Sequence, residues 1–386
     1  MQEYLYSLAT DRRKGPVAGL IKIFLYVLSL IYGLAVLALM FVCRLGRRSL
    51  KCKVISVGNI TLGGTGKTSL VEFIARYLKT KGRKAAILSR GYKKTNSDYG
   101  MHYASYGTMG DEPYMLKVNL KDVPVLVDAN RIRAASLAVS DYGSDTLILD
   151  DGLQQWKIKK DLEIVTIDST NPFGNRRLIP RGILRQPIST LRSADIFILT
   201  KTNFSSDVPE LKKLLGRINP QAELFESVHE PEGFYKLDES DKLLDTGELK
   251  GKTVTLISGI GDPLSFERMI RDLGVKIGLS FRFEDHHHYS KKDLEDIIAQ
   301  SRKSRIEAVV TTQKDAIRIN PEAMAYKPIS VFVLRIALKI IKDEEKFYNR
   351  LLKLYSAEVA WARRRALFAA NLHIFRQNGR RIALFI

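Results

Sequence analysis

The residues with the clearest chemical potential form the segment GNITLGGTGKT, residues 58–68. Glycines allow backbone N–H groups to turn toward phosphate oxygens, and a helix that begins at such a loop adds a favourable dipole. Lys67 is positioned to reach the β- and γ-phosphates, and the Thr68 hydroxyl to bind Mg²⁺. The strict pattern has Gly where this chain has Thr61, so the segment is predicted to be a variant P-loop. Its expected phosphate-binding residues are Gly63, Gly64, Thr65, Gly66, Lys67 and Thr68.

Two neighbouring carboxylates follow a short apolar run at 147–149. In P-loop proteins the end of such a strand holds Mg²⁺ directly or through water, so Asp150 and Asp151 are candidate metal residues together with Thr68. The alternative is an acidic turn that closes a strand.

Asp111 and the run Asp285-His286-His287-His288 are candidates for acid–base chemistry. Asp111 also fits the N-cap of a following helix. Adjacent histidines in a regular element cannot all point at one metal, so one imidazole acting as a general base or proton relay is favoured over a zinc site.

Basic side chains crowd a loop at 171–187 that also contains Pro and Gly. Near a phosphate-transfer site, such a loop suggests a clamp for an anionic substrate or for transition-state charge, and a solvated basic loop is the alternative. The arginines are Arg176, Arg177, Arg181 and Arg185.

Strand-length apolar runs alternate with amphipathic helices, which predicts an α/β fold with a parallel sheet covered on both faces. Ligands of such sheets bind at the carboxyl ends of strands, where these motifs fall. The alternation weakens at 225–244, and a second α/β unit follows. Strands are expected at 53–57, 84–88, 124–128, 146–149, 162–167, 196–199, 254–257, 275–283, 308–311 and 331–334; helices are expected at 68–81, 131–142, 291–301 and 343–355.

The 386 residues exceed one ordinary core and suggest two domains with appendages. The only cysteines, Cys43 and Cys52, have no metal-ligand spacing and argue for a reducing compartment. More than half of the net charge of +20 lies in residues 1–53 and 356–386. Because these basic ends flank apolar stretches, an anionic membrane surface fits better than nucleic acid.

Residues 23–43 contain no charged side chain, and this length matches the roughly 20 residues that cross a bilayer core. A buried or membrane-surface helix is the alternative, and basic residues on both sides leave the orientation open. The P-loop follows directly, so the active site is expected close to the membrane.

Taken in order, the motifs resemble those of the tetraacyldisaccharide 4′-kinases, the enzymes that phosphorylate the lipid A precursor. The resemblance covers about residues 23–355. Besides the uncharged segment and the P-loop, it rests on SRGY at 89–92, GDEP at 110–113, DDGLQ at 150–154, RLIP at 177–180, LRQP at 184–187, SGIG at 258–261, DH at 285–286 and TTQKD at 311–315.

The resemblance implies transfer of the γ-phosphate of ATP, with Mg²⁺, to the 4′-hydroxyl of a tetraacylated disaccharide 1-phosphate. It implies that Asp111 acts with His286 in deprotonating that hydroxyl. It implies a location on the cytoplasmic face of the inner membrane, and neither a nucleic-acid nor a protein partner is predicted. The expected organisation is an N-terminal membrane-associated helix with basic flanks (1–50), a P-loop kinase domain (51–228), a smaller α/β domain (229–355) and a basic extension without assigned role (356–386). The substrate-binding residues are expected to be Asn59, Arg90, Tyr92, Gln154, Arg177, Arg181 and Arg185.

Two other functions compete. A P-loop GTPase switch or metallochaperone needs a base-reading Asn-Lys-x-Asp and paired Cys or His ligands, but this chain has TKTN at 200–203 and no usable Cys pair. A membrane-tethered structural ATPase gives no reason for the arginine-rich loop or the Asp–His pair.

Overall fold

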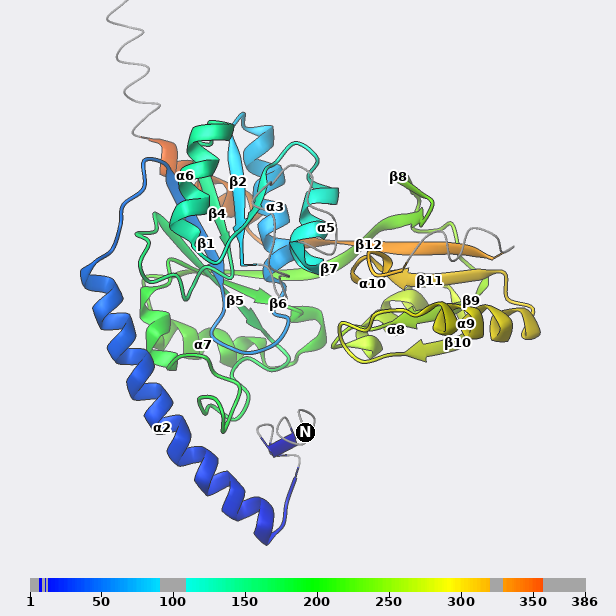
Figure 1. Ribbon diagram of the computed structural model, residues 1–386, viewed down its shortest axis with the longest axis horizontal. Helices are drawn as coiled ribbons and strands as arrows, with labels where there is room; N and C mark the ends of the chain where they lie inside the picture. Colours follow the sequence, from blue (N-terminus) through cyan, green and yellow to red (C-terminus); the bar gives the residue numbers. More distant parts are fainter. Residues whose placement is uncertain (1–6, 9–10, 12, 91–108, 320–328, 357–386) are drawn as a thin grey trace, which may run out of the picture. The chain divides into compact units, whose positions relative to one another are not determined.

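The computed structural model describes residues 7–8, 11, 13–90, 109–319 and 329–356 (Figure 1). The chain divides into a large unit, Met1–Lys342, and a small C-terminal unit, Asp343–Ile386. In the small unit, α11 (Glu344–Leu352) continues into the 3₁₀ turn η4 (Lys353–Tyr355). The basic extension expected at 356–386 lies outside the described residues except for Ser356.

The large unit is built on a sheet whose described strands follow the order β10-β9-β11-β12-β7-β6-β5-β1-β4-β2-β3, with β8 paired to β7. Strands β1 to β6 are all parallel to their neighbours, as the alternating pattern predicts. Their bounds are β1 Lys53–Gly58, β2 Ala85–Ser89, β3 Val125–Val127, β4 Thr146–Asp150, β5 Leu162–Asp168 and β6 Ile196–Thr200.

The expected junction at 225–244 is instead a long strand, β7 (Glu223–Lys236), followed by β8 (Glu239–Leu244). The first part of β7 is parallel to β6, whereas its later part is antiparallel to β12 (Ser330–Ile340). Pro231 and Gly233 are accommodated where the register with β12 shifts, which is where a strand tolerates a missing N–H. The predicted domain boundary at 228/229 falls inside β7, and the division into two domains stays a prediction.

The remaining strands are β9 (Thr253–Ser258), β10 (Lys276–Arg282) and β11 (Ala308–Thr312). They are mutually parallel, and β11 is parallel to β12. The sheet is therefore mixed, because β7 pairs antiparallel with both β8 and β12. Helices α8 (Pro263–Asp272), α9 (Lys291–Lys303) and the short α10 (Gln313–Ala316) connect these strands.

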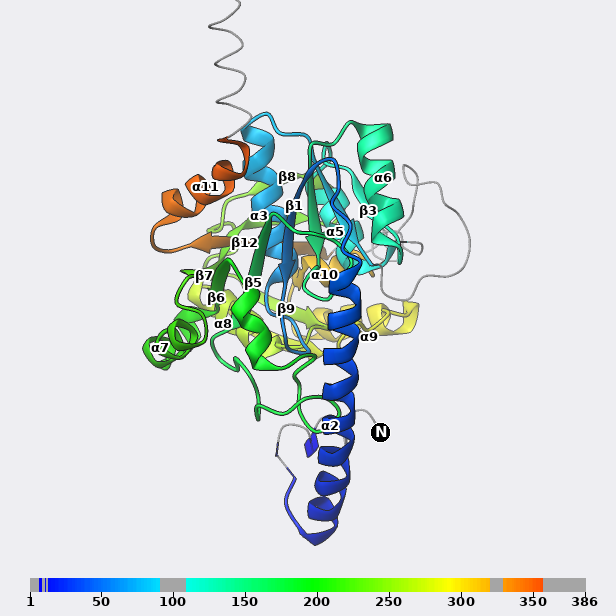
Figure 2. The same cartoon turned by 90° about the vertical axis from the view of Figure 1, so that its left-hand side faces the viewer.

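Helices pack on the sheet through apolar residues at helical spacing. Helix α3 (Lys67–Thr80) buries Leu70, Val71, Ile74 and Leu78, and α6 (Arg131–Tyr142) packs alanines against β2 and β4. In Figure 2, α6 lies beside β3, and α3 lies near β1; α5 (Asp111–Asn119) contacts both α3 and β3. Helix α7 (Val208–Ile218), which the sequence reasoning did not single out, buries Leu211 and Leu215 in a core with β5 and β6.

The uncharged N-terminal run lies within one helix, α2 (Pro16–Leu45), whose 30 residues correspond to about 45 Å. By length and composition, α2 is the one helix in the described residues that is apolar enough to cross a membrane. One face is buried at Leu25, Ser29, Gly33, Val36 and Met40. The rest exposes large apolar side chains, including Phe24, Leu34 and Phe41.

Candidate active site

The P-loop connects the carboxyl end of β1 to the start of α3, as predicted. Gly66 precedes the helix with a φ of 76°, in the left-handed region that favours glycine. A Cβ there would lie 3.0 Å from Cε1 of His229, so this turn has neither the conformation nor the space for a side chain. Gly63 likewise has a φ of 105°.

Neighbouring strand ends hold the loop in place. The Thr65 hydroxyl lies 2.7 Å from that of Thr166 on β5, and Thr200 on β6 donates to the Thr65 carbonyl at 3.3 Å. The cradle is thus fixed at the carboxyl edge of three parallel strands, β1, β5 and β6.

The Lys67 ammonium group donates to Oδ1 of Asn59 at 3.1 Å and lies 3.7 Å from Asp151. Burial lowers the pKa of Lys67, and the charge of Asp151 opposes this shift. Asn59, expected to bind substrate, therefore also holds the P-loop lysine.

Arg185 connects the basic loop at 171–187 to Asn59 and Asp151, the residues that contact Lys67. Its guanidinium donates two hydrogen bonds to the Asp151 carboxylate and others to the carbonyl and side-chain oxygens of Asn59. Burial tends to raise the pKa of Asp151, but the hydrogen bonds from Arg185 and the charge of Lys67 lower it overall. Asp151 is thereby held as a carboxylate.

Asp150, in contrast to Asp151, lies where its protonated form is favoured. Its side chain is buried; Oδ2 accepts from Ser89 at 3.4 Å, and Oδ1 has no partner among the described residues. Burial, with the negative charge of Glu112, raises its pKa to about 7. An unpartnered buried carboxylate oxygen beside a phosphate cradle fits a polar or cationic ligand.

The donor set suits Mg²⁺, which prefers oxygen ligands and usually keeps waters and substrate phosphates in its shell. The described residues contain no group of three or more His, Cys, Asp or Glu side chains that could hold a metal by themselves. Of the predicted metal residues, Asp150 has the unpartnered oxygen, and Thr68 is the second residue of α3. Both oxygens of Asp151 are occupied by Arg185.

Two further predicted substrate residues can be placed. Gln154 donates to the Asn59 carbonyl at 3.0 Å, while its buried Oε1 has no partner in the described part of the chain. Arg90 is exposed directly after β2. Tyr92 lies outside the described residues.

The Asp111–His286 pair is present. Nδ1 of His286 lies 2.8 Å from Oδ2 of Asp111, although the two residues are 175 positions apart. Asp111 is the first residue of α5, and the N-cap position is taken by Gly110, so the N-cap alternative does not hold. Of the other histidines in the run, His287 stacks on Phe283 and lies 3.2 Å from Asp293.

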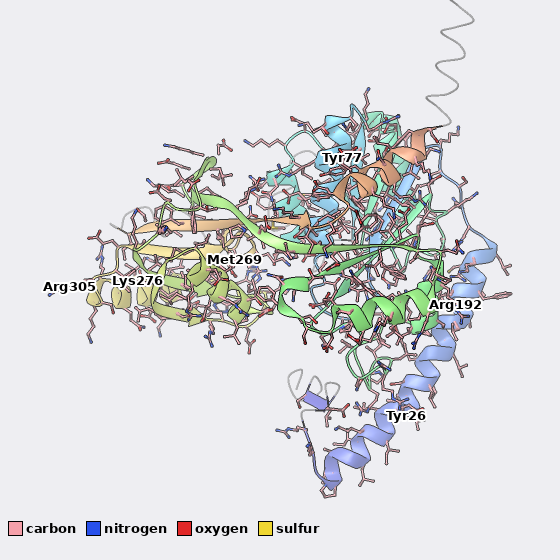
Figure 3. The ribbon with its side chains drawn as sticks, turned by 180° about the vertical axis from the view of Figure 1, so that it is seen from behind. Tyr26, Tyr77, Arg192, Met269, Lys276 and Arg305 are labelled. Carbon is pink, nitrogen blue, oxygen red and sulfur yellow. The ribbon has the colours of Figure 1, made fainter. Side chains whose placement is uncertain are left out.

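Arg177 and Arg181 are not with the P-loop. Arg177 lies over the ring of Tyr26 on α2 (labelled in Figure 3), with its guanidinium carbon 4.8 Å from the ring centroid. Arg181 pairs with Asp11 at 2.7 Å. Within the basic loop only Arg185 joins Lys67 and Asp151, because the loop folds back between Leu178 and Leu184 and its first part faces α2.

The sequence reasoning missed an ion pair and a buried arginine at this site. Glu112 accepts from Lys314 at 2.6 Å. Burial disfavours the charge of Glu112, but Lys314 lowers its pKa overall, and the Thr68 hydroxyl also contributes. Arg318 contacts Asp111 directly. Their positions in the sequence could have pointed to them. Glu112 follows Asp111, Lys314 lies within the TTQKD motif, and Arg318 lies just after it.

A glycine-rich loop between a parallel strand and a helix, with its lysine beside carboxylates at the strand ends, defines the class of P-loop proteins, to which P-loop kinases belong. The family model described as tetraacyldisaccharide-1-P 4′-kinase matches residues 21–356. The chain therefore belongs to the tetraacyldisaccharide 4′-kinase family.

Individual relatives agree over nearly the whole length. The tetraacyldisaccharide 4′-kinase of Halothermothrix orenii is 34% identical over 367 residues, which cover 88% of this chain and 94% of the relative. That of Elusimicrobium minutum is 36% identical, with 87% and 92% covered. The crystal structure of LpxK from Aquifex aeolicus in complex with ATP matches with a TM-score of 0.68 and 28% identity, covering 87% of this chain and 99% of that one.

Proposed function

We infer that this protein is an ATP-dependent kinase that transfers the γ-phosphate to the 4′-hydroxyl of a tetraacyldisaccharide 1-phosphate, the lipid A precursor. The observation that carries this inference is the contact between Asp111 and His286, next to Glu112, whose carboxylate interacts with Thr68 and Lys67 of the P-loop. A switch GTPase or metallochaperone has no use for such a pair.

The residues divide the work of phosphoryl transfer. A sugar hydroxyl is a poor nucleophile near neutral pH, so the Asp111–His286 pair accepts its proton. Lys67 and the loop backbone hold the β- and γ-phosphates, while Arg185 adds positive charge next to them. When bound, Mg²⁺ supplies neutralisation of phosphate charge, and Thr68 and Asp150 are the residues to hold it, with Asp151 close by.

The substrate-binding residues are part of the proposal. Asn59, Gln154 and Arg185 converge on the P-loop and are assigned to substrate there, with Arg90 and Tyr92 on the segment that follows β2. Arg177 and Arg181 are assigned to the acceptor only near the N-terminal segment, since Arg177 lies over Tyr26 of α2 and Arg181 pairs with Asp11 ahead of that helix.

The direct test is phosphate transfer from labelled ATP to tetraacyldisaccharide 1-phosphate in detergent micelles, with wild type, Lys67→Ala and Asp111→Ala side by side. Lipid product that depends on the acceptor and is lost in both variants supports the proposal. Hydrolysis without lipid product, surviving in Asp111→Ala, contradicts it.

We also propose that the protein works at the cytoplasmic face of the inner membrane, with α2 in contact with anionic lipid. The acceptor carries acyl chains, and α2 exposes Leu34 and Phe41 to about two thirds or more. Flotation with anionic vesicles tests this. Wild type should float, Leu34→Gln/Phe41→Gln should float less, and the control Leu243→Gln on β8 should match wild type. Equal flotation of all three would refute a role for α2.

The proposed division into a P-loop part and a smaller α/β part places Asp111 in the first and His286 in the second. In that division, the 2.8 Å contact between the two side chains brings a residue from each part into one catalytic pair. A His286→Ala variant with near-normal turnover would count heavily against this view.

A further inference from the structure

Arg318 is a buried arginine at the Asp111–His286 pair. Its side chain is fully shielded from solvent. Nε donates to Oδ2 of Asp111 at 2.8 Å, and Nη2 lies 2.5 Å from the same oxygen. Burying a guanidinium has a high desolvation cost unless its N–H groups are hydrogen-bonded. The groups that Arg318 contacts therefore indicate its role.

Residues that follow strands β9 and β11 fix the other edge of the guanidinium. Nη1 donates to the carbonyl of Gly259 at 3.1 Å and lies 3.4 Å from Oδ1 of Asp315. Asp315 is itself held by Tyr289 at 2.9 Å, by the Gly259 N–H at 3.0 Å and by Thr312 at 2.6 Å. The orientation of Arg318 is therefore set by its own surroundings, and its Nε edge is presented to Asp111.

The same contacts bear on which ring nitrogen of His286 carries the proton. Nδ1 lies 2.8 Å from Oδ2 of Asp111 and 3.1 Å from Nη2 of Arg318. A guanidinium has only donors, so it engages the carboxylate, and Nδ1–H is the imidazole form that also satisfies Oδ2. The backbone supports this position, since His286 has a φ of 65° and its N–H donates to the Gly259 carbonyl that Arg318 also contacts.

We propose that Arg318 is a positioning residue for phosphoryl transfer: it fixes the Asp111 carboxylate in its charged form and His286 in the Nδ1–H form. The pair can then accept the acceptor's hydroxyl proton as that oxygen bonds to the γ-phosphorus and the bond to the β–γ bridging oxygen breaks, releasing ADP. This inference rests on the proposed kinase function.

The charged groups around the pair determine the expected pH behaviour. Besides Arg318 they are Asp315, Asp285 at 4.0 Å from Nε2 of His286, and Glu112 with its partner Lys314. Removing one buried cation next to Asp111 and His286 favours the protonated form of both. The acidic limb of the kcat/KM profile should therefore move to higher pH, by ~1 unit.

The test is a double-mutant cycle on acceptor-dependent transfer, with Arg318→Met, Asp111→Asn and the double variant. Arg318→Met should lower kcat about 100-fold in the wild-type background and change it less than threefold when Asp111→Asn is present. Arg318→Lys should restore the position of the acidic limb but only part of kcat, because a lysine cannot reproduce the planar fork. Multiplicative losses in the double variant, or an unmoved acidic limb, would overturn the proposal.

The control is Arg282→Met. It removes an arginine whose Nε donates to the buried Glu267 carboxylate of α8 at 2.7 Å, rather than to Asp111. It should leave kcat and the pH profile unchanged. If Arg318→Met does not fold, Arg318→Gln removes the same positive charge while keeping hydrogen-bond donors, and it must shift the acidic limb in the same direction. If the wild-type enzyme itself formed no lipid product, the proposed kinase function would be refuted. This outcome differs from a failure of the Arg318 proposal, in which wild type is active but the variants behave otherwise than expected.

Discussion

Arg185 and Asp151 meet through two parallel hydrogen bonds, Nη1 to Oδ2 and Nη2 to Oδ1, each 2.8 Å long. The same Nη2 also donates to Asn59, whose Oδ1 accepts from Lys67. The basic loop and the P-loop lysine are thereby joined through one asparagine and one carboxylate.

Replacement of Arg185 by lysine should show how much of its effect comes from the positive charge and how much from the two parallel hydrogen bonds to Asp151. Lysine keeps the positive charge but cannot make both hydrogen bonds, so we expect kcat/KM to fall ~10-fold, and ~100-fold in Arg185→Ala. Steady-state kinetics with the lipid acceptor measure both. Arg192→Lys is the control, since this exposed arginine (labelled in Figure 3) lies outside the site. Equal activity of Arg185→Lys and wild type would show that the paired geometry is unimportant.

Lys67→Ala should strongly reduce transfer while leaving the fold intact. The ammonium group is the charge placed for the γ-phosphate, and its loss should cost about 10²- to 10³-fold in kcat. Lys79→Ala, on the same helix but paired with exposed Asp122, is the matched control. The two variants should unfold at similar temperatures, and a comparable loss of activity in both would point to damage to α3.

Asp150→Asn should stabilise the nucleotide-free protein at high pH while it inactivates the enzyme. With a native pKa of about 7, Asp150 keeps its proton in the folded state at pH values where the unfolded chain has already released it. The free energy of unfolding therefore falls as pH rises from about 4 to 7. Asparagine removes this loss, so thermal unfolding should show a gain of the order of 4 kcal/mol at pH 8 and almost none at pH 4. A gain that is the same at both pH values would contradict the assignment.

Helix α2 should influence acceptor use through its packing on the basic loop. An ideal Cβ on Gly33 would lie 2.7 Å from Cδ1 of Leu178, whereas one on Gly19 of the same helix would meet nothing within 4 Å. Gly33→Phe should therefore displace the loop and raise KM for the lipid acceptor severalfold. Gly19→Phe is the matched control and should not. Equal KM values in the two variants would show that the contact does not matter.

Most of the sheet and the P-loop were predictable because their signals are local. An apolar run that ends in glycines and Gly-Lys-Thr specifies strand, loop and helix from adjacent residues, and β1 and α3 begin and end within a residue of expectation. The antiparallel pairing of β7 was not predictable, since Pro231 and Gly233 usually interrupt strands and only the register shift opposite them makes room.

Contacts between side chains that are far apart in the sequence could not be predicted either. Charge alone placed four arginines in one loop, but it could not say that Arg181 faces Asp11 while Arg185 faces Asp151. Arg318 is 207 positions from Asp111, and no local pattern links them. The Asp–His pair itself was expected only from the family resemblance.

The packing of α2 has a practical consequence for making the enzyme soluble. Ser29 donates to the Leu178 carbonyl and Tyr32 to the Arg185 carbonyl, both at 2.8 Å, so the helix braces the residue that reaches the nucleotide loop. Deleting the helix would take this support away together with the apolar surface. Polar replacement of Phe24, Leu34 and Phe41, which face outward, is the better engineering route. These substitutions reduce the exposed apolar surface of the helix and keep the hydrogen bonds from its buried face to the basic loop.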